Sequence, residues 1–458
     1  MPSGASLSEI ALPTRICSRK QIILNGFDMF TPSHLSFGQW RRPGDRAKDK
    51  RRDLTYWTDL ANILERGDIT ALFLADTYGQ HDTYRGSAEP TLRTACQFPM
   101  GDPSIPVTAM AAVTKNLCFA ITMSTSYESP FVGRFGWNVV TSFKQSGADA
   151  VGLPSVEHDK RYEIADDYLR CLYKIWESSW DDDALREDAK SEVYADFSRV
   201  RWIQHETENF KINAPHILDP SPQRTPFLFQ AGTSPAGMVF AATHAEGVFV
   251  SAPSPHILAP RVANIRKQAV ALGRDPESIK IFAVVTPQKY QEALKYASFE
   301  AGLAFYSSNA GIDLSQYDLD KVITPDDVSV DGRVHSLMNS PKYQGADIPS
   351  WTPRNIGKAV SIGGNGPVPV GSAATVADIL EEWVEIGDLD GFNVGYVTTP
   401  GSFEDLVDLL VPELRRRGRY PTVAGKTLRE RVFGVGQSKL RDDHLGSTYK
   451  YDVYTADG

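Results

Sequence analysis

The stretch Gly136-Trp137-Asn138-Val139-Val140-Thr141-Ser142 is a short, strand-like apolar run that ends in polar residues. Several other runs of the chain have the same character. They are Phe73-Leu74-Ala75-Asp76, Met123-Ser124-Thr125-Ser126-Tyr127, Gln230-Ala231-Gly232-Thr233-Ser234 and Gly391-Phe392-Asn393-Val394. In a (β/α)8 barrel, active-site groups lie at the carboxyl ends of successive parallel strands. These runs therefore predict such a barrel, with its chemistry gathered at one end.

Strands and helices alternate along the chain, which is typical of a parallel α/β architecture. A helix is expected over Asp53–Arg66, with Asp53 as its N-cap and Gly67 just past its end. A long helix is expected over Asp159–Trp176, and another from about Pro235 to His244. The expected barrel strands are Gln21–Phe30, Ile69–Ala75, Leu117–Met123, Phe135–Thr141, Phe227–Ala231, Gly247–Ser251, Ile279–Val285 and Gly391–Val397.

The length of 458 residues suits one barrel domain that carries insertions. We expect a single domain over residues 1–458, with insertions at about 180–226 and 288–369. The second insertion is long, irregular and rich in Gly, Ser, Asp and Pro, and it is interpreted as a lid because such loops are uncommon unless functional or disordered. Residues 417–458 show little periodic apolar pattern and are expected to form an extended tail.

The connection between the third and fourth expected strands is short. Only about nine residues separate the strand that ends near Thr125 from the strand that begins near Phe135. A parallel crossover normally takes a dozen or more residues, usually with a helix. We therefore expect a shortened crossover near residues 126–134, produced either by local remodelling of the barrel or by a mis-assembled gene product. A similar shortening is expected at Val285–Tyr290.

The composition excludes several classes of protein. A formal charge of −9 and an isoelectric point near 5.6 argue against a nucleic-acid partner, which is usually bound by a basic patch. No run of about 18 apolar residues is present, so no membrane span is expected. The first twenty residues lack the apolar stretch of a secretory signal, which favours a cytoplasmic enzyme. The four cysteines have no metal-ligand spacing, so neither a metal site nor a disulfide framework is expected.

Taken together and in this order, the runs resemble the flavin-dependent monooxygenases of the bacterial-luciferase superfamily. The branch they resemble is that of the nitrilotriacetate, dibenzothiophene-sulfone and long-chain-alkane monooxygenases, and the resemblance extends from about Leu24 to about Tyr451. It implies a two-component enzyme, in which a separate NAD(P)H-dependent flavin reductase supplies reduced FMN (FMNH2). It further implies that FMNH2 reacts with O2 to give a C4a-(hydro)peroxide, which oxygenates a small organic substrate. A homodimer or homotetramer is also implied.

The run Gln230–Gly237 is the clearest candidate for a phosphate site. It combines a strand end, a glycine, the hydroxyls of Thr233 and Ser234, and a helix start, and backbone N–H groups at a helix N-terminus bind phosphate well. Ser234 could equally be a simple N-cap followed by Pro235. His158 and Tyr162 lie four residues apart and share one helix face. The resemblance implies that they contact the flavin phosphate and ribityl chain; otherwise they are a surface histidine and a packing tyrosine.

The resemblance places further residues around the flavin ring and the substrate. It implies that Asp76 accepts hydrogen bonds from the ring, unless it only caps the turn before Gly79, and that Ser124 contributes a hydroxyl. Asn138 would hold the polar edge of the ring, with Trp137 as an apolar wall. Tyr78 would line the ring or substrate pocket. His34 matches a position near the substrate cavity, although an ordinary loop histidine is the competing interpretation.

Two other functions remain open at this stage. The same superfamily contains deazaflavin (F420)-dependent hydride-transfer enzymes with a similar phosphate site. A non-catalytic, degenerate member is the second possibility, because a missing barrel helix would expose the apolar flank of two strands.

Overall fold

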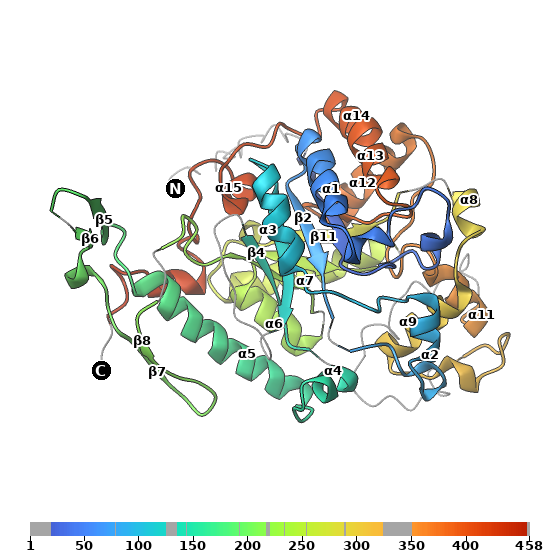
Figure 1. Ribbon diagram of the computed structural model, residues 1–458, viewed down its shortest axis with the longest axis horizontal. Helices are drawn as coiled ribbons and strands as arrows, with labels where there is room; N and C mark the ends of the chain where they lie inside the picture. The colour runs from blue at the N-terminus through green and yellow to red at the C-terminus, as the bar shows by residue number, and fades with distance from the viewer. Residues whose placement is uncertain are drawn as a thin grey trace, which may run out of the picture.

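The barrel predicted from the strand-like runs is present. The computed structural model describes residues 20–455, except 78, 125–134, 143, 192, 217–219, 233, 253, 288–289 and 324–349. Among the described residues, parallel strands close into an eight-stranded barrel in the order β1-β12-β11-β10-β9-β4-β3-β2 (Figure 1). The strands are β1 (Ile23–Met29), β2 (Ala71–Ala75), β3 (Cys118–Ser124), β4 (Phe135–Val140), β9 (Phe227–Gln230), β10 (Gly247–Val250), β11 (Lys280–Val285) and β12 (Gly391–Val394).

Side chains alternate between the inside and the outside of the barrel, as the two-residue period of a strand requires. In β2, Ala71 and Phe73 belong to the interior cluster, whereas Leu72 and Leu74 pack outward. Aromatic rings fill the interior, and Phe229 stacks on Phe249 with ring centroids 5.2 Å apart. The barrel is therefore a packed core and not a pore, and it leaves space for a ligand only at its ends.

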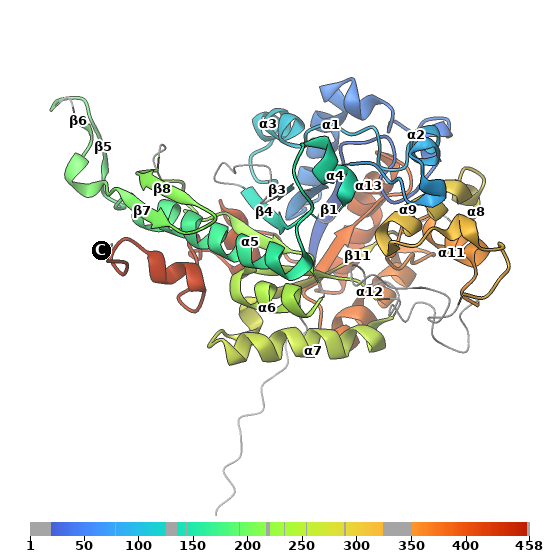
Figure 2. The same cartoon turned by 90° about the horizontal axis from the view of Figure 1, so that it is seen from below.

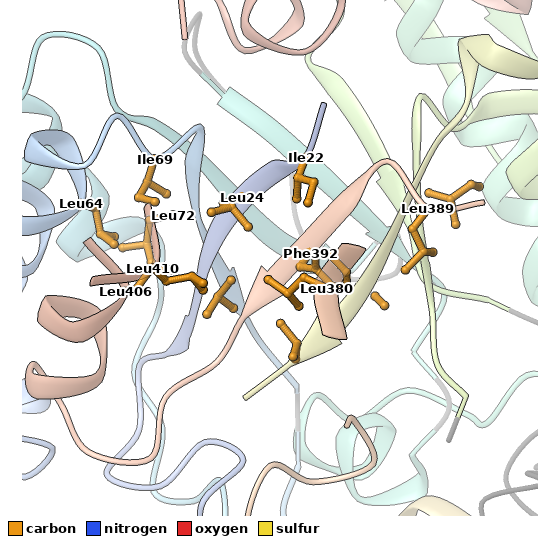
Figure 3. Close-up of a cluster of buried hydrophobic side chains, with 14 of the residues drawn as sticks. Ile22, Leu24, Leu64, Ile69, Leu72, Leu380, Leu389, Phe392, Leu406 and Leu410 are labelled. Carbon is orange, nitrogen blue, oxygen red and sulfur yellow. The ribbon is translucent and has the colours of Figure 1, made fainter. Parts of the chain in front are cut away.

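Helices surround the barrel and bury the outward faces of its strands (Figures 1 and 2). Figure 3 shows part of this layer, in which Leu72 lies beside Leu64 and Leu410. As expected, the Asp53 side chain caps the helix that ends at Arg66, accepting from the Thr55 N–H, and Gly67 follows its end. The helices of this layer are α1 (Leu54–Arg66), α3 (Ser104–Val113), α5 (His158–Tyr173), α6 (Pro235–His244), α7 (Pro255–Ala271), α12 (Ala373–Gly387), α13 (Gly401–Asp405) and α14 (Val411–Arg416). None of the helices described is long and apolar enough to cross a membrane.

Strands β3 and β4 pair directly despite the short connection between them. Their parallel register runs from Phe119 opposite Phe135 to Ser124 opposite Val140. The expected shortened crossover itself falls on residues 125–134, which lie outside the described part of the chain. The outward side chains of the two strands are buried, except Met123, which is partly buried, and Trp137 packs against Trp176, just beyond α5. The apolar flank of this strand pair is therefore covered.

The segment at about 180–226 leaves the barrel and forms two antiparallel hairpins. The first pairs β5 (Leu185–Asp188) with β6 (Val193–Ala195), and the second pairs β7 (Ile203–Glu206) with β8 (Lys211–Ala214). Both hairpins extend to one side of the molecule, beyond α5 (Figures 1 and 2).

The segment 288–369 is less irregular than its composition predicts. It contains α8 (Tyr290–Leu294), α9 (Phe299–Ala310) and α11 (Pro353–Val360). Helices α9 and α11 approach closely, because a Cβ atom on Gly302 would lie 2.4 Å from the Gly357 carbonyl oxygen. The absence of a side chain at Gly302 thus allows α9 and α11 to pack closely, in a segment that was expected to be irregular. Two shorter helices, α2 (Glu89–Thr94) and α4 (Gln145–Ala150), also lie outside the main layer.

The expectation of an extended tail beyond residue 417 is wrong. This segment contains α15 (Leu428–Phe433), and Leu428 packs with the aromatic side chains of the barrel interior. Arg429 is 0% exposed and pairs with Glu246, with an Nε–Oε1 distance of 2.6 Å. The tail therefore closes the amino-terminal end of the barrel. The sequence did not predict this arrangement, because α15 is short and has few apolar residues.

Candidate active site

A pocket of about 250 Å³, lined by both polar and apolar groups, lies at the carboxyl ends of β2, β3, β4 and β9. This is the end of the barrel at which the sequence placed the chemistry. Neighbouring strands each contribute residues at or just beyond their carboxyl ends, so segments distant in sequence meet around one space. The described residues that line it are Asp76, Thr77, Thr122, Ser124, Val139, Val140, Thr141, Ser142, Lys144, Gly147, Tyr162, Gln230, Ala231 and Gly232.

Three of the expected cofactor-binding residues meet in this pocket. Asp76 directly follows β2, Ser124 is the last residue of β3, and Tyr162 projects from the first turns of α5. The Ser124 hydroxyl lies 2.7 Å from that of Ser142. Thr122 and Ser124 both line the pocket, as expected from their alternate positions on one strand.

The backbone of the pocket is strained at Ser142. This residue has a φ of 36°, a region that side chains other than glycine rarely adopt. Strain of this kind costs roughly 1–3 kcal/mol and persists where surrounding structure enforces it, commonly at ligand sites. Ser142 is thus a strained residue in the pocket wall that the sequence did not indicate.

The phosphate candidate forms a tight cradle beside Tyr162. A Cβ atom on Gly232 would lie 2.3 Å from Gln230 Nε2 and 2.6 Å from the Tyr162 hydroxyl. The Gly232 N–H donates to Gln230 Oε1 at 2.8 Å. Ser234 caps α6, accepting from the Gly237 N–H at 3.1 Å, so the capping interpretation holds in this structure. Thr233 lies outside the described residues.

His158 lies next to Tyr162 but does not line the pocket. The two rings are 5.3 Å apart, which agrees with their expected position on one helix face. The His158 side chain is 25% exposed, and its Nδ1 lies 2.6 Å from Asp159 Oδ1. Among the described residues, His158 therefore contacts this end of the pocket through the Tyr162 ring.

Asn138 lies inside the barrel just below the pocket, whereas Trp137 points away from it. Asn138 donates to the Thr122 hydroxyl at 3.1 Å, and its Oδ1 has no hydrogen-bond partner among the described residues. Trp137 is 0% exposed, donates to the Met123 carbonyl at 3.1 Å, and packs on Tyr168 of α5. The expectation that Trp137 walls the ring site is wrong, because adjacent residues of a strand face opposite sides.

His34 lies beyond the end of β1 and is buried at 2% exposure. Its ring packs edge-on against Phe27 at 4.5 Å. Burial, together with the nearby Lys50 ammonium, lowers the pKa of His34 to about 3, so its imidazole is neutral. Its Nδ1 and the hydroxyls of Thr31 and Ser33 find no partner among the described residues. Tyr78, also expected near the substrate, lies outside the described residues.

A buried ion pair holds the segment that carries His34. The Lys50 ammonium lies 2.5 Å from Asp28 Oδ1 on β1, and both side chains are 0% exposed. Lys50 also donates to the Tyr396 hydroxyl beyond β12, and the Tyr56 hydroxyl donates to Asp28. This network joins the ends of β1 and β12 behind the His34 ring.

Lys144 is a site residue that the sequence reasoning missed. It lies four residues beyond the end of β4, and its Nζ is 3.4 Å from Nδ1 of the buried His81. Burial lowers the pKa of Lys144 to about 8, against the opposing effects of Cys96 and Asp82. Burial and the Lys144 charge lower the pKa of His81 to about 3. The sequence signal that could have identified Lys144 as a site residue is its position shortly after the end of a strand.

The described part of the chain contains no group of three His, Cys, Asp or Glu side chains able to hold a metal. The pocket instead offers hydroxyls, amides, one ammonium and one carboxylate. Such a set suits an organic ligand with several polar groups. Together, the closed parallel barrel and the pocket at its carboxyl end define an α/β-barrel enzyme site.

Comparison with known proteins identifies the family. The chain matches the luciferase-like monooxygenase family over residues 29–390 and belongs to it. It is 42% identical to dimethyl-sulfide monooxygenase of Hyphomicrobium sulfonivorans, over 95% of each chain. Relatives in the same branch include long-chain alkane monooxygenase, dibenzothiophene-sulfone monooxygenase and nitrilotriacetate monooxygenase component A.

Solved structures agree with this assignment. The crystal structure of DmoA from Hyphomicrobium sulfonivorans superimposes with a TM-score of 0.87 at 41% identity, covering 94% of this chain and 96% of that one. A crystal structure of riboflavin lyase with modified FMN and riboflavin gives a TM-score of 0.84 at 34% identity, covering 94% and 100%. The chain is therefore similar to monooxygenases of this branch over nearly its whole length.

Proposed function

We propose that this protein is the oxygenase component of a two-component flavin-dependent monooxygenase, which uses FMNH2 and O2 to oxygenate a small organic substrate. Its family membership supports an oxygenase. The riboflavin lyase structure with modified FMN supports a flavin, and the relative named as component A supports a separate reductase. When bound, reduced flavin supplies the electrons that activate oxygen.

The residues present fit a flavin mononucleotide. Gly232 lines the pocket just before the N-terminus of α6 and packs closely against the Tyr162 hydroxyl, and a helix N-terminus suits a phosphate. The phosphate-binding end of the site would be completed by Thr233, Ser234 and His158. Asp76, Ser124 and Asn138 would hold the polar edge of the ring, because each ends a strand or faces inward near the pocket.

Unpartnered buried polar atoms are the observation that carries the proposal. Asn138 Oδ1, His34 Nδ1 and the Ser33 hydroxyl are buried at the carboxyl end of the barrel without partners among the described residues. Leaving a buried polar group unsatisfied costs roughly 1–3 kcal/mol, so a ligand that satisfies such groups gains affinity. A neutral His34 can donate or accept a hydrogen bond, and we assign it, with Tyr78, to the substrate side of the ring.

Two partners complete the proposal. One is an NAD(P)H-dependent flavin reductase that delivers FMNH2, and the other is a second copy of the chain in a homodimer or homotetramer. The F420-dependent enzymes that superimpose on this chain share only 12–13% identity, which shows the fold alone and does not favour hydride transfer.

An anaerobic titration of the purified chain with FMNH2, followed by mixing with O2 and a panel of organic sulfides and alkanes, tests the function. We expect saturable binding and one oxygen atom incorporated per product, traced with ¹⁸O2 by mass spectrometry. A folded chain that binds no FMNH2 would instead identify a degenerate member. Binding without oxygenation of any compound, together with hydride transfer from reduced F420, would favour the deazaflavin class.

A further inference from the structure

Lys144 brings a positive charge into the pocket. Among the described lining residues, it is the one cation, and Asp76 is the one anion. It stands at the N-cap position of α4, where the chain turns back over the end of β4. The Lys144 residue is half-buried in the pocket wall, and a charge held there exerts a strong field because water screens it poorly.

A chain of hydrogen bonds fixes the position of the ammonium. Lys144 Nζ lies 3.4 Å from His81 Nδ1, and His81 Nε2 lies 3.2 Å from Gln97 Oε1. Gln97 Nε2 in turn donates to the His34 carbonyl at 2.9 Å. A neutral His81 accepts at Nδ1 and donates at Nε2, so every bond in this chain has a donor and an acceptor. The network holds Lys144 against the loop that follows β2.

Lys144 follows β4, but its ammonium reaches toward the β2 side of the pocket, whereas the phosphate cradle lies on the β9 side. Around the barrel rim the order is β9-β4-β3-β2, with Gly232 beyond β9 and the His81 anchor of Lys144 beyond β2. If the flavin phosphate binds beside Gly232, the flavin ring therefore lies toward the β2 side of the pocket, where His81 holds the Lys144 ammonium.

Only the ring distinguishes reduced from oxidised FMN electrostatically. Both forms carry the same phosphate. The reduced ring loses a proton from N1 near neutral pH and becomes an anion, whereas the oxidised ring is neutral. A cation near the ring edge therefore stabilises the reduced form selectively, and charge near N1 is a general means by which proteins tune flavins.

We propose that Lys144 gives this site its preference for reduced over oxidised FMN. The inference rests on the proposed function, because it requires a flavin in the pocket. An oxygenase that receives FMNH2 from a separate reductase and must release oxidised FMN benefits from such a preference. Lys144 thus favours uptake of FMNH2 and release of oxidised FMN. His81 and Gln97 hold the Lys144 side chain in position.

The test compares dissociation constants of FMNH2 and oxidised FMN, measured on flavin-free protein by anaerobic titration. The wild type is expected to bind FMNH2 more tightly. In Lys144→Met we expect FMNH2 affinity to fall about tenfold or more, as for loss of a charge-assisted bond, and oxidised FMN affinity to change less than twofold. Lys144→Arg keeps the charge and should keep the preference. Equal losses for both forms would overturn the proposal, since they would indicate a phosphate contact or a structural role.

The pH dependence of the wild type provides a second test that needs no variant. Lys144 is protonated below its pKa of about 8, so the preference for FMNH2 should decline as pH rises past 8. The ring's own ionisation occurs near neutral pH and is largely complete by pH 8, so it does not offset this decline. The other groups that face Lys144 are His81, Asp82 and Cys96; burial raises the pKa of the Cys96 thiol, so it stays neutral. A preference that rises or stays level above pH 8 would overturn the proposal. If the wild type binds neither form, the proposed function itself fails, and this inference fails with it.

Discussion

Two buried groups at opposite ends of the barrel differ in how their polar atoms are satisfied: the Arg429 guanidinium, and the polar side chains that follow β1. At the amino-terminal end, Arg429 of α15 is 0% exposed, and its guanidinium donates to Glu246 and to backbone carbonyls, including those of Thr225 and Ser438. At the carboxyl end, Thr31, Ser33 and His34 are equally buried, but each has a side-chain polar atom without a partner among the described residues.

The difference separates stability from function within one fold. A buried guanidinium with every nitrogen engaged locks the tail onto the strand ends and leaves nothing for a ligand. Unpartnered groups destabilise the free protein and become favourable only when a ligand satisfies them. Barrel enzymes generally divide their two ends in this way.

Breaking the amino-terminal end should give the largest effect. Arg429→Ala leaves the Glu246 carboxylate buried and unpaired, so we expect the free energy of unfolding to fall by about 3–5 kcal/mol. Urea denaturation measures this loss. The control is Arg416→Ala, whose side chain is 70% exposed beside Glu413 and should change stability by less than about 0.5 kcal/mol. A loss below 1 kcal/mol for Arg429→Ala would show that α15 does not lock the barrel.

The buried histidine at the carboxyl end should make stability depend on pH. The folded pKa of His34 is about 3, below the unfolded value of about 6.5, so the unfolded chain binds an extra proton between these pH values. Stability is therefore full above pH 6.5 and declines as pH falls toward 3, by up to about 1.4 kcal/mol per pH unit for this residue.

The His34→Gln variant should lose this contribution of His34 to the pH dependence of the free energy of unfolding. Urea denaturation between pH 4 and 7 measures the change. His256→Gln, at an exposed position of α7, is the matched control and should leave the slope unchanged. An unaltered slope in His34→Gln would mean that this imidazole takes up its proton equally well in the folded protein.

Filling the phosphate cradle should produce the smallest change in free energy. Gly232→Ala introduces a methyl group 2.6 Å from the Tyr162 hydroxyl, so the Tyr162 and Gln230 side chains, which line the pocket, must shift. We expect the dissociation constant of FMNH2 to rise about tenfold, or about 1.4 kcal/mol, with stability nearly unchanged.

Gly387→Ala, where the added methyl would have ordinary contacts at 3.6 Å, is the control for this substitution and should bind FMNH2 normally. Unchanged affinity in Gly232→Ala would remove this cradle from the flavin site.

Local signals predicted much of the fold. The helix at Asp53–Arg66 and the helix from Pro235 to His244 were bounded by their caps, because capping residues act within one turn. The 17-residue helix α7 was missed, and α9 was hidden in a segment rich in Gly and Ser. Those helices are stabilised by packing partners far away in sequence, such as α11 against α9, and not by strong local patterns.

The sequence by itself determined the strand-and-helix alternation, the end of the barrel that carries the site, and the family to which the chain is similar. It did so because strand ends, caps and apolar runs are local features. Only the tertiary structure decided that Trp137 faces α5, that Leu428 plugs the barrel, and that Lys144 lies against His81. These contacts join segments tens to hundreds of residues apart, and barrel closure, not local chemistry, brings them together.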